Sequence, residues 1–447
     1  MKWMTGQRRI IACIAVLIAA ALCCGNAQAY WGKGLPCRDR DAKFAVLSDP
    51  HLYNSRLGTE GEAFEKYLQQ DRKLIAESEA ILDAAIESIL DDRDIKFVLV
   101  SGDLTKDGAR SSHQLLARKL ARLEWAGKKV FVVPGNHDVN NPHAYAYDGA
   151  WEIPVANVSP WQFKWIYRHF GYLEAKYRDP HSLSYVAEPV PGVWLIAMDA
   201  CLYEDNEADG YPATGGEFRP ETLKWVMKMI AKGKKRGKKL IGMMHHGVLE
   251  HYQGQSQLFP EYVIANWREV SRQLGEAGLK VVFTGHYHAN DVTTLSDGNG
   301  APVLTDVETG SLVTAPCPCR VAAIKKDNTL EIDTQTITEI DYDTGGVPFP
   351  EYAQQYLAQG LTGIAYYMLM GQYNLPPGDT TLLYASQLSE AFQAHYAGDE
   401  SPSLETLQLI GAYLGSGDPV QYLIGQYLGA LWTDLDPEDT TVTVGLN

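Results

Sequence analysis

Six short apolar segments recur along the chain, and a loop follows each of them. They are rich in Val, Ile, Leu and Phe and lack polar alternation, which is typical of strands buried on both faces. We therefore expect strands at residues 44–48, 97–101, 130–134, 193–198, 239–244 and 280–284.

Segments with helical periodicity lie between these strands. The longest is 71–92, where one stripe holds seven apolar residues: Leu74, Ile75, Ile81, Leu82, Ile86, Ile89 and Leu90. The alternation of strands and helices predicts an α/β fold with central sheets, in which ligands gather at the carboxyl ends of strands. Further helices are expected near 112–126, 160–169, 219–233 and 261–277.

The pattern changes in the last third of the chain. Shorter strands such as 329–337 are expected up to residue 343. Residues 352–432 are rich in Tyr, Leu, Ala and Gln and are broken by turn-forming segments, which predicts three or four helices. We divide the chain accordingly into a main domain at 30–345 and a helical C-terminal region at 346–447.

The first 29 residues have the features of a signal peptide. Lys2, Arg8 and Arg9 precede a short apolar run, and Ala27-Gln28-Ala29 has the form of a cleavage site. The apolar run is shorter than the roughly 20 residues that a membrane span needs. We expect cleavage after Ala29, export to the periplasm or the extracellular space, and no transmembrane span in the mature chain. A lipid anchor on Cys23 or Cys24 is the alternative.

Charge and cysteine content narrow the picture further. The formal net charge of −16 over 447 residues argues against long nucleic acid as a partner. Export would place the four remaining cysteines in an oxidising compartment, where three pairings or free buried thiols are open. They are Cys37, Cys201, Cys317 and Cys319. Nothing in the sequence indicates the protein partners or the oligomeric state.

Five of the predicted strands run directly into residues that bind metals. Asp, Asn and His together suit divalent ions such as Zn, Mn or Fe, and their number is sufficient for two ions. A carboxylate such as Asp103 can bridge two cations about 3.5–4 Å apart. Glycines 102, 135 and 285 let the backbone turn sharply and approach a ligand. The segments are 48-SDPH-51, 102-GD-103, 135-GNHD-138, 245-HHG-247 and 285-GHYH-288.

In this order, the five segments resemble the calcineurin-like metallophosphoesterase family over about residues 42–325. The resemblance implies two packed mixed β-sheets flanked by helices, and hydrolysis of a small phosphate mono- or diester by a metal-bridging hydroxide. It implies two divalent or trivalent metal ions (Mn, Fe or Zn), the first bound by Asp49, His51 and His288, and the second bound by Asn136, His245 and His286. Asp103 would bridge the two metals. His137 would donate a proton to the leaving oxygen, and Asp138 would orient it.

Several alternatives stay open at this stage. Family members have His-x-Pro where this chain has His245-His246-Gly247, so His246 competes with His245 as the ligand. The aromatic segment 139–185 either covers a sheet edge or forms a substrate wall that brings Asn141, His143, Tyr145 or Tyr147 near the phosphate. His251 is either a surface residue or a support for a ligand. The rival function is a non-catalytic module that binds metal or phosphate and recruits a partner through its helical C-terminus.

Overall fold

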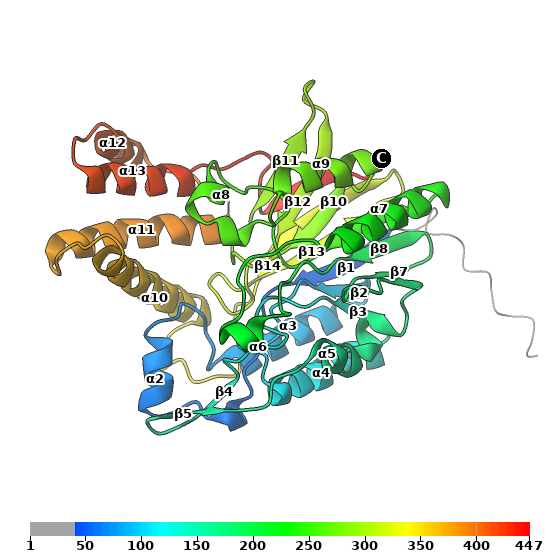
Figure 1. Ribbon diagram of the computed structural model, residues 1–447, viewed down its shortest axis with the longest axis horizontal. Helices are drawn as coiled ribbons and strands as arrows, with labels where there is room; N and C mark the ends of the chain where they lie inside the picture. Colours follow the sequence, from blue (N-terminus) through cyan, green and yellow to red (C-terminus); the bar gives the residue numbers. More distant parts are fainter. Residues whose placement is uncertain (1–40, 399) are drawn as a thin grey trace, which may run out of the picture.

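Two β-sheets pack face to face and helices flank them in the computed structural model, which describes residues 41–398 and 400–447 (Figure 1). The expected signal peptide at 1–29 and Cys37 lie outside the described residues. The observed architecture is the mixed α/β fold with two large sheets that we expected.

The first sheet has six strands. Its centre is parallel, because β1 pairs with β2 and β2 with β3 in the same direction, and the strands on the other side of β1 are antiparallel. In spatial order the strands are β15 (Thr441–Gly445), β14 (Thr329–Thr336), β13 (Pro318–Ile324), β1 (Ala42–Leu47), β2 (Ile95–Val100) and β3 (Lys129–Val132).

The second sheet has seven strands. Four neighbouring strands are parallel and the edges are antiparallel. In spatial order they are β11 (Val292–Ser296), β12 (Pro302–Glu308), β10 (Val281–Thr284), β9 (Lys239–Met243), β8 (Val193–Ala197), β7 (Tyr185–Ala187) and β6 (Tyr177–Arg178). A small hairpin, β4 (Tyr145–Asp148) with β5 (Trp151–Pro154), lies apart from both sheets.

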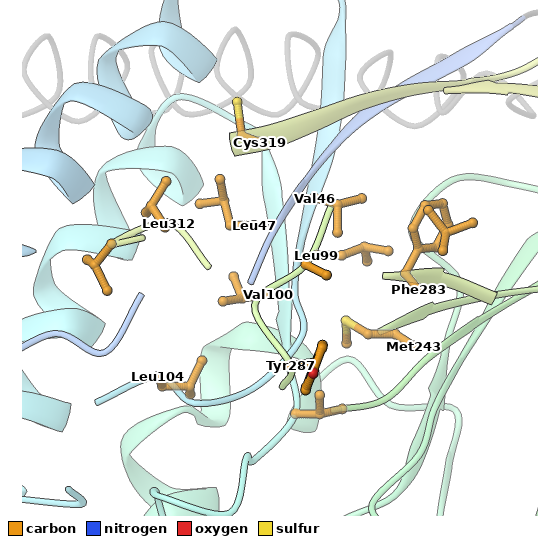
Figure 2. Packing of buried hydrophobic residues seen from close by; sticks show 14 of the residues in the cluster. Val46, Leu47, Leu99, Val100, Leu104, Met243, Phe283, Tyr287, Leu312 and Cys319 are labelled. Carbon is orange, nitrogen blue, oxygen red and sulfur yellow. The ribbon is translucent and has the colours of Figure 1, made fainter. Parts of the chain in front are cut away.

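All six predicted strands are confirmed, as β1, β2, β3, β8, β9 and β10. Nearly all of their residues are buried, as continuous apolar runs in a two-sided sheet should be. The sheets share a core in which the ring of Phe44 on β1 lies 5.5 Å from that of Phe283 on β10. Figure 2 shows Val46 and Leu99 of the first sheet close to Met243 and Phe283 of the second.

The helices lie where the periodicity predicts them, with two shifted starts. The stripe at 71–92 gives a helix only from Ser78, and a short turn at Pro260–Tyr262 precedes the helix expected at 261–277. Leu74 and Ile75 are nevertheless buried, so they belong to the core without belonging to the helix. The helices before residue 345 are α2 (Glu62–Leu68), α3 (Ser78–Asp91), α4 (Arg110–Trp125), α5 (Pro160–Ile166), α6 (Asn206–Asp209), α7 (Pro220–Lys235), α8 (Gln255–Leu258) and α9 (Trp267–Ala277), with short turns η2 (Ser55–Leu57), η3 (Arg168–Tyr172) and η4 (Pro260–Tyr262).

The C-terminal region contains four helices and then a strand. Figure 1 shows the helices on one side of the sheets, beside α8. The expected three or four helices are confirmed, and the strand β15 that follows them pairs with β14 and forms the edge of the first sheet. Within the described residues, no helix is long and apolar enough to cross a membrane. The four helices are α10 (Phe349–Gly371), α11 (Asp379–Ala397), α12 (Leu404–Leu414) and α13 (Pro419–Leu431).

Candidate metal centre

The carboxyl ends of β1, β2, β9 and β10, and the loop after β3, bring the predicted ligands together. Three of them, Asp49, His51 and His288, form one group. The Nε2 atoms of His51 and His288 lie 3.1 Å apart. Asp49 Oδ1 lies 3.8 Å from His51 Nε2 and 3.6 Å from His288 Nε2. All three side chains are buried, so these atoms face one another away from solvent.

A second group lies on the other side of Asp103. His245 Nε2 lies 3.0 Å from Asn136 Oδ1 and 3.4 Å from Asp103 Oδ1. The ligand atoms of Asp103, His245 and His286 lie within 4.8 Å of one another. The structure therefore places all seven predicted ligands in one buried cluster.

Asp103 contacts both groups with different oxygen atoms. Its Oδ1 faces His245, while its Oδ2 lies 3.6 Å from His51 Nε2. A carboxylate placed between two donor groups in this way has the arrangement of a bridging ligand.

The donor atoms are better suited to binding cations than to forming hydrogen bonds with one another. Asp49 Oδ1 is buried and has no hydrogen-bond partner, which is costly for a carboxylate oxygen. Burial, as the largest cause, holds the pKa values of His51 and His288 well below their usual range. Two neutral imidazoles and an unpaired carboxylate oxygen at these distances form a ligand set that suits a divalent ion.

Hydrogen bonds to main-chain carbonyls fix which nitrogen of two histidines faces the cluster. His245 Nδ1 lies 3.0 Å from the carbonyl oxygen of Ser101, and His286 Nε2 lies 3.2 Å from that of Glu261. A carbonyl only accepts, so these two nitrogens carry the proton. A bound metal would then be coordinated by His245 Nε2 and His286 Nδ1, as in other metal sites whose histidines are oriented by an outer hydrogen bond.

The charges of the cluster compensate one another in part. Burial would raise the pKa of Asp103, but the charges of His245 and His137 hold it well below its usual range. Burial would lower the pKa of His245, but Asp103 and Asp49 raise it to about 9. Asp49 is different, because burial raises its pKa to about 6.

The backbone around the cluster is strained. Five of the seven predicted ligands have positive φ, a conformation that is uncommon outside glycine and that gathers at functional sites. A Cβ added to Gly135 would lie 2.1 Å from Asp103 Oδ1, and one added to Gly285 would lie 2.3 Å from Asp49 Oδ2. Glycine is thus required for close approach at both positions. The five residues with positive φ are Asp49, His51, Asp103, His286 and His288.

His137 lies at the edge of the cluster, but its partner is not the expected one. Its Nδ1 lies 3.0 Å from Asp107 Oδ1, and its side chain is 25% exposed. The expectation that Asp138 orients His137 is wrong. The carboxylate of Asp138 instead accepts hydrogen bonds from the main-chain N–H groups of Leu104, Thr105 and Gly135, which hold the two loops together.

The geometry separates His245 from His246. His246 Nε2 lies 3.0 Å from the carbonyl oxygen of Thr214, so this nitrogen donates away from the cluster. His245 Nε2 faces Asp103. The position therefore favours His245 as the ligand.

Three residues near the cluster were missed by the sequence analysis. Asp107 contacts His137, and the positive charges of Arg72 and Lys73 act on the cluster histidines. Asp107 lies only four residues after Asp103, so its loop was a signal that it could reach the site. The basic pair Arg72-Lys73 belongs to no recognisable motif, so no sequence pattern indicated that it lies near the site.

The remaining candidates lie outside the cluster. Asn141 donates to the carbonyl oxygen of His137 at 2.9 Å, and the Tyr147 hydroxyl accepts from Lys106 at 3.1 Å. His143 contacts the carbonyl of Gly210 and stacks on Tyr145.

Two further expectations concern buried groups. His251 is fully buried, so its interpretation as a surface residue is wrong. Its Nδ1 lies 2.6 Å from the Oδ1 of Asp291, which follows the predicted ligand His288 by three residues. Cys201, Cys317 and Cys319 are free buried thiols.

The sequence model described as calcineurin-like phosphoesterase matches residues 42–290, which is more than half of the chain. The chain belongs to the calcineurin-like phosphoesterase family. It is therefore a phosphoesterase by family, and the resemblance seen in the five motifs is confirmed. A comparison with curated protein sequences found no match.

Several solved structures are similar to the chain. A dimetal phosphatase from Danio rerio is 16% identical with a TM-score of 0.46, and the match covers 67% of this chain and 97% of that one. Purple acid phosphatase PPD1 from yellow lupin (Lupinus luteus) is 12% identical with a TM-score of 0.39, covering 66% and 52%. Phosphopantetheinyl hydrolase from Mycobacterium tuberculosis is 14% identical with a TM-score of 0.31, covering 61% and 90%.

Proposed function

We propose that the protein hydrolyses phosphate mono- or diesters at two divalent cations, with His137 as the proton donor to the leaving oxygen. The proposal depends on one observation, that the two oxygens of Asp103 face two separate groups of donor atoms. Asp49, His51 and His288 would hold one cation, and Asn136, His245 and His286 the other. Mn, Fe and Zn all suit this mixture of oxygen and imidazole ligands.

Two bound cations would supply an activated water and neutralise the charge of the phosphate. The chain itself contributes position and a proton. His137 is exposed enough to meet a leaving oxygen, and the contact with Asp107 fixes the direction of its ring. Its Nε2 lies 3.9 Å from Asp103 Oδ2, so this nitrogen faces the edge of the cluster where a substrate would bind.

Metal analysis combined with a panel of aryl phosphate mono- and diesters tests the proposal. We expect two metal ions per chain and turnover on at least one ester class. Asp103→Asn offers a single carbonyl oxygen in place of the carboxylate, so it should bind one ion or none and lose activity by more than about 100-fold. A protein that binds two ions yet hydrolyses no ester of the panel contradicts the proposal.

His137→Ala separates proton transfer from metal binding. We expect both ions to remain and turnover to fall by about 10²- to 10⁴-fold. The loss should be smaller for esters with acidic leaving groups, because these depart without a proton. An equal loss for good and poor leaving groups would remove His137 from the proposed role.

We also propose that the protein is exported, on the support of the signal-peptide features of residues 1–29. Fractionation of expressing cells and N-terminal sequencing test this. A mature chain that begins at Tyr30 outside the cytoplasm is the expected result, and a cytoplasmic chain that keeps Met1–Ala29 contradicts it.

A further inference from the structure

A cavity of about 120 Å³ lies between the segments that follow β9 and β10 and the C-terminal helices. Phe259 belongs to the main domain, and α10, α11 and α13 supply the rest of the apolar wall. A space of this size is close to the cavity of about 150 Å³ that holds benzene in a protein interior. The apolar wall is formed mainly by Phe259, Leu361, Ala365, Leu388, Phe392 and Tyr427.

The cavity reaches residues that touch the metal centre. Tyr262 lines it, and the ring of Tyr262 lies 4.7 Å from the ring of the ligand His286. Tyr287 also lines it and stands between His286 and His288 in the chain. The cavity and the cluster therefore share the loop that follows β10.

Arg72 lies at the boundary between them. It lines the cavity, and its Nε donates to the Tyr396 hydroxyl at 2.9 Å. No ion pair found in residues 41–398 and 400–447 includes Arg72. The ring of Tyr396 lies 6.2 Å from the ring of Tyr287, which stands in the chain between the predicted ligands His286 and His288. An arginine with donors left over at a cavity that borders the loop after β10 suits an anionic group such as phosphate.

The cavity offers little to a polar occupant. Three of its tyrosine hydroxyls already have partners inside the protein, Tyr252 for Tyr287, Arg72 for Tyr396 and Tyr373 for Tyr427. A sugar or an amide placed among these walls would lose its hydrogen bonds with water and gain few in return.

We infer that this cavity receives an apolar substituent of the substrate, about the size of a phenyl or butyl group, while Arg72 binds the phosphate at its mouth. The substrate class is thus a phosphate ester with an alkyl or aryl group. The inference rests on the proposed phosphoesterase function, and it gives the C-terminal helices a part in substrate selection.

Binding of alkylphosphonates to the metal-loaded protein tests the inference without turnover. Isothermal titration calorimetry with methyl-, butyl- and benzylphosphonate compares ligands that share the anionic group. We expect butyl- and benzylphosphonate to bind roughly 10- to 50-fold more tightly than methylphosphonate, because they bury more apolar surface. Equal affinities for the three ligands would overturn the inference.

Two substitutions on α10 locate the effect. Ala365→Leu fills the cavity and should remove the preference for butylphosphonate while leaving methylphosphonate binding intact. Met368→Ala enlarges the cavity and should shift the preference to longer chains, which serves as a second variant if the first folds poorly. Gln359→Leu adds the same side chain at an exposed position of the same helix and should change nothing. A preference that survives both cavity variants contradicts the inference.

Arg72→Gln tests the other half of the site. It should weaken all three phosphonates by a similar factor, about 10-fold, because the lost contact is to the shared anionic group. An unchanged affinity removes Arg72 from the site. The two proposals fail separately: an absence of turnover with the alkyl preference intact rejects hydrolysis, whereas turnover without the preference rejects the cavity.

Discussion

The imidazole of His137 is held by Asp107, whose Oδ1 lies 3.0 Å from Nδ1. Asp107→Ala should lower kcat by about 10- to 100-fold while the metal content stays unchanged, because the ring loses its fixed orientation. Asp107→Asn keeps a carbonyl oxygen at this place and should restore much of the activity. Equal activity of the alanine variant and the parent protein would remove Asp107 from this positioning role.

Asp138 serves as the matched comparison for Asp107. Its carboxylate accepts hydrogen bonds from three main-chain N–H groups and from the Thr105 hydroxyl, whereas the His137 ring is bound by Asp107. Asp138→Ala should therefore lower the free energy of unfolding by about 2–4 kcal/mol, since buried donors lose their partner. Thermal unfolding of Asp107→Ala and Asp138→Ala, measured side by side, distinguishes a residue that orients the His137 ring from one that holds the two loops together.

The neighbours His245 and His246 should respond differently to substitution. His245→Ala removes a ligand, so the variant should bind at most one ion and lose more than about 100-fold in turnover. His246→Ala should keep both ions, because its Nε2 contacts the Thr214 carbonyl. Metal analysis of both variants is the measurement, and loss of metal from His246→Ala alone would reverse the assignment.

Gly135 should not tolerate a side chain. In Gly135→Ala the new Cβ would lie 2.1 Å from Asp103 Oδ1 and 2.2 Å from the Asp103 main-chain nitrogen, so the Asp103 loop must shift. We expect a loss of about 1–3 kcal/mol in stability and weakened metal binding. Gly411→Ala is the control, because this helical position has open space and alanine should stabilise it by up to about 1 kcal/mol. Similar behaviour of the two variants would show that the Asp103 loop is not confined.

His113 should contribute to acid sensitivity. Burial lowers its pKa to about 3, while an unfolded chain takes up this proton near pH 6.5. The unfolded state binds more protons in this window, so the contribution is complete above pH 6.5. It is lost by about 1.4 kcal/mol per pH unit as the pH falls towards 3.

Urea unfolding of the metal-free protein at a series of pH values measures this effect. His113→Gln should flatten the dependence of stability on pH between 6.5 and 3, relative to the parent chain. Parallel curves for the two proteins would mean that His113 does not titrate differently on folding.

Removal of the metals should destabilise the fold. Each cation that binds only the folded chain adds about 2.7 kcal/mol when its concentration is 100 times its dissociation constant. Chelation should therefore lower the unfolding temperature, and restored Mn²⁺ or Zn²⁺ should raise it again. An unfolding temperature that stays the same after chelation and after the metal is restored contradicts cation binding at the cluster.

Much of the fold and of the metal-binding cluster could be predicted from the sequence. Buried strands such as β1 and β2 are recognisable because both faces are apolar, and parallel strands bring their carboxyl ends to one edge. Asp49 and Asp103 therefore had to approach each other. The match of residues 42–290 to a known family agrees with that convergence.

Other features depend on three-dimensional contacts that spacing does not encode. Asp107 and Asp138 are both close to His137 along the chain or in space, and only the course of the loop decides between them. The positive φ of His51 or His288 leaves no trace in residue type. The strand Thr441–Gly445 has a short Thr-Val alternation, but five residues after four helices gave too little signal.

The position of β15 beside β14 constrains the four helices between them. Helices α10–α13 form an insertion between two adjacent strands of one sheet, and both of its ends are fastened there. A unit anchored twice cannot swing away on a single tether, so a cut in one interhelical loop should leave both fragments attached. Deleting the whole unit together with β15 would instead expose the edge of β14 to pairing with other chains.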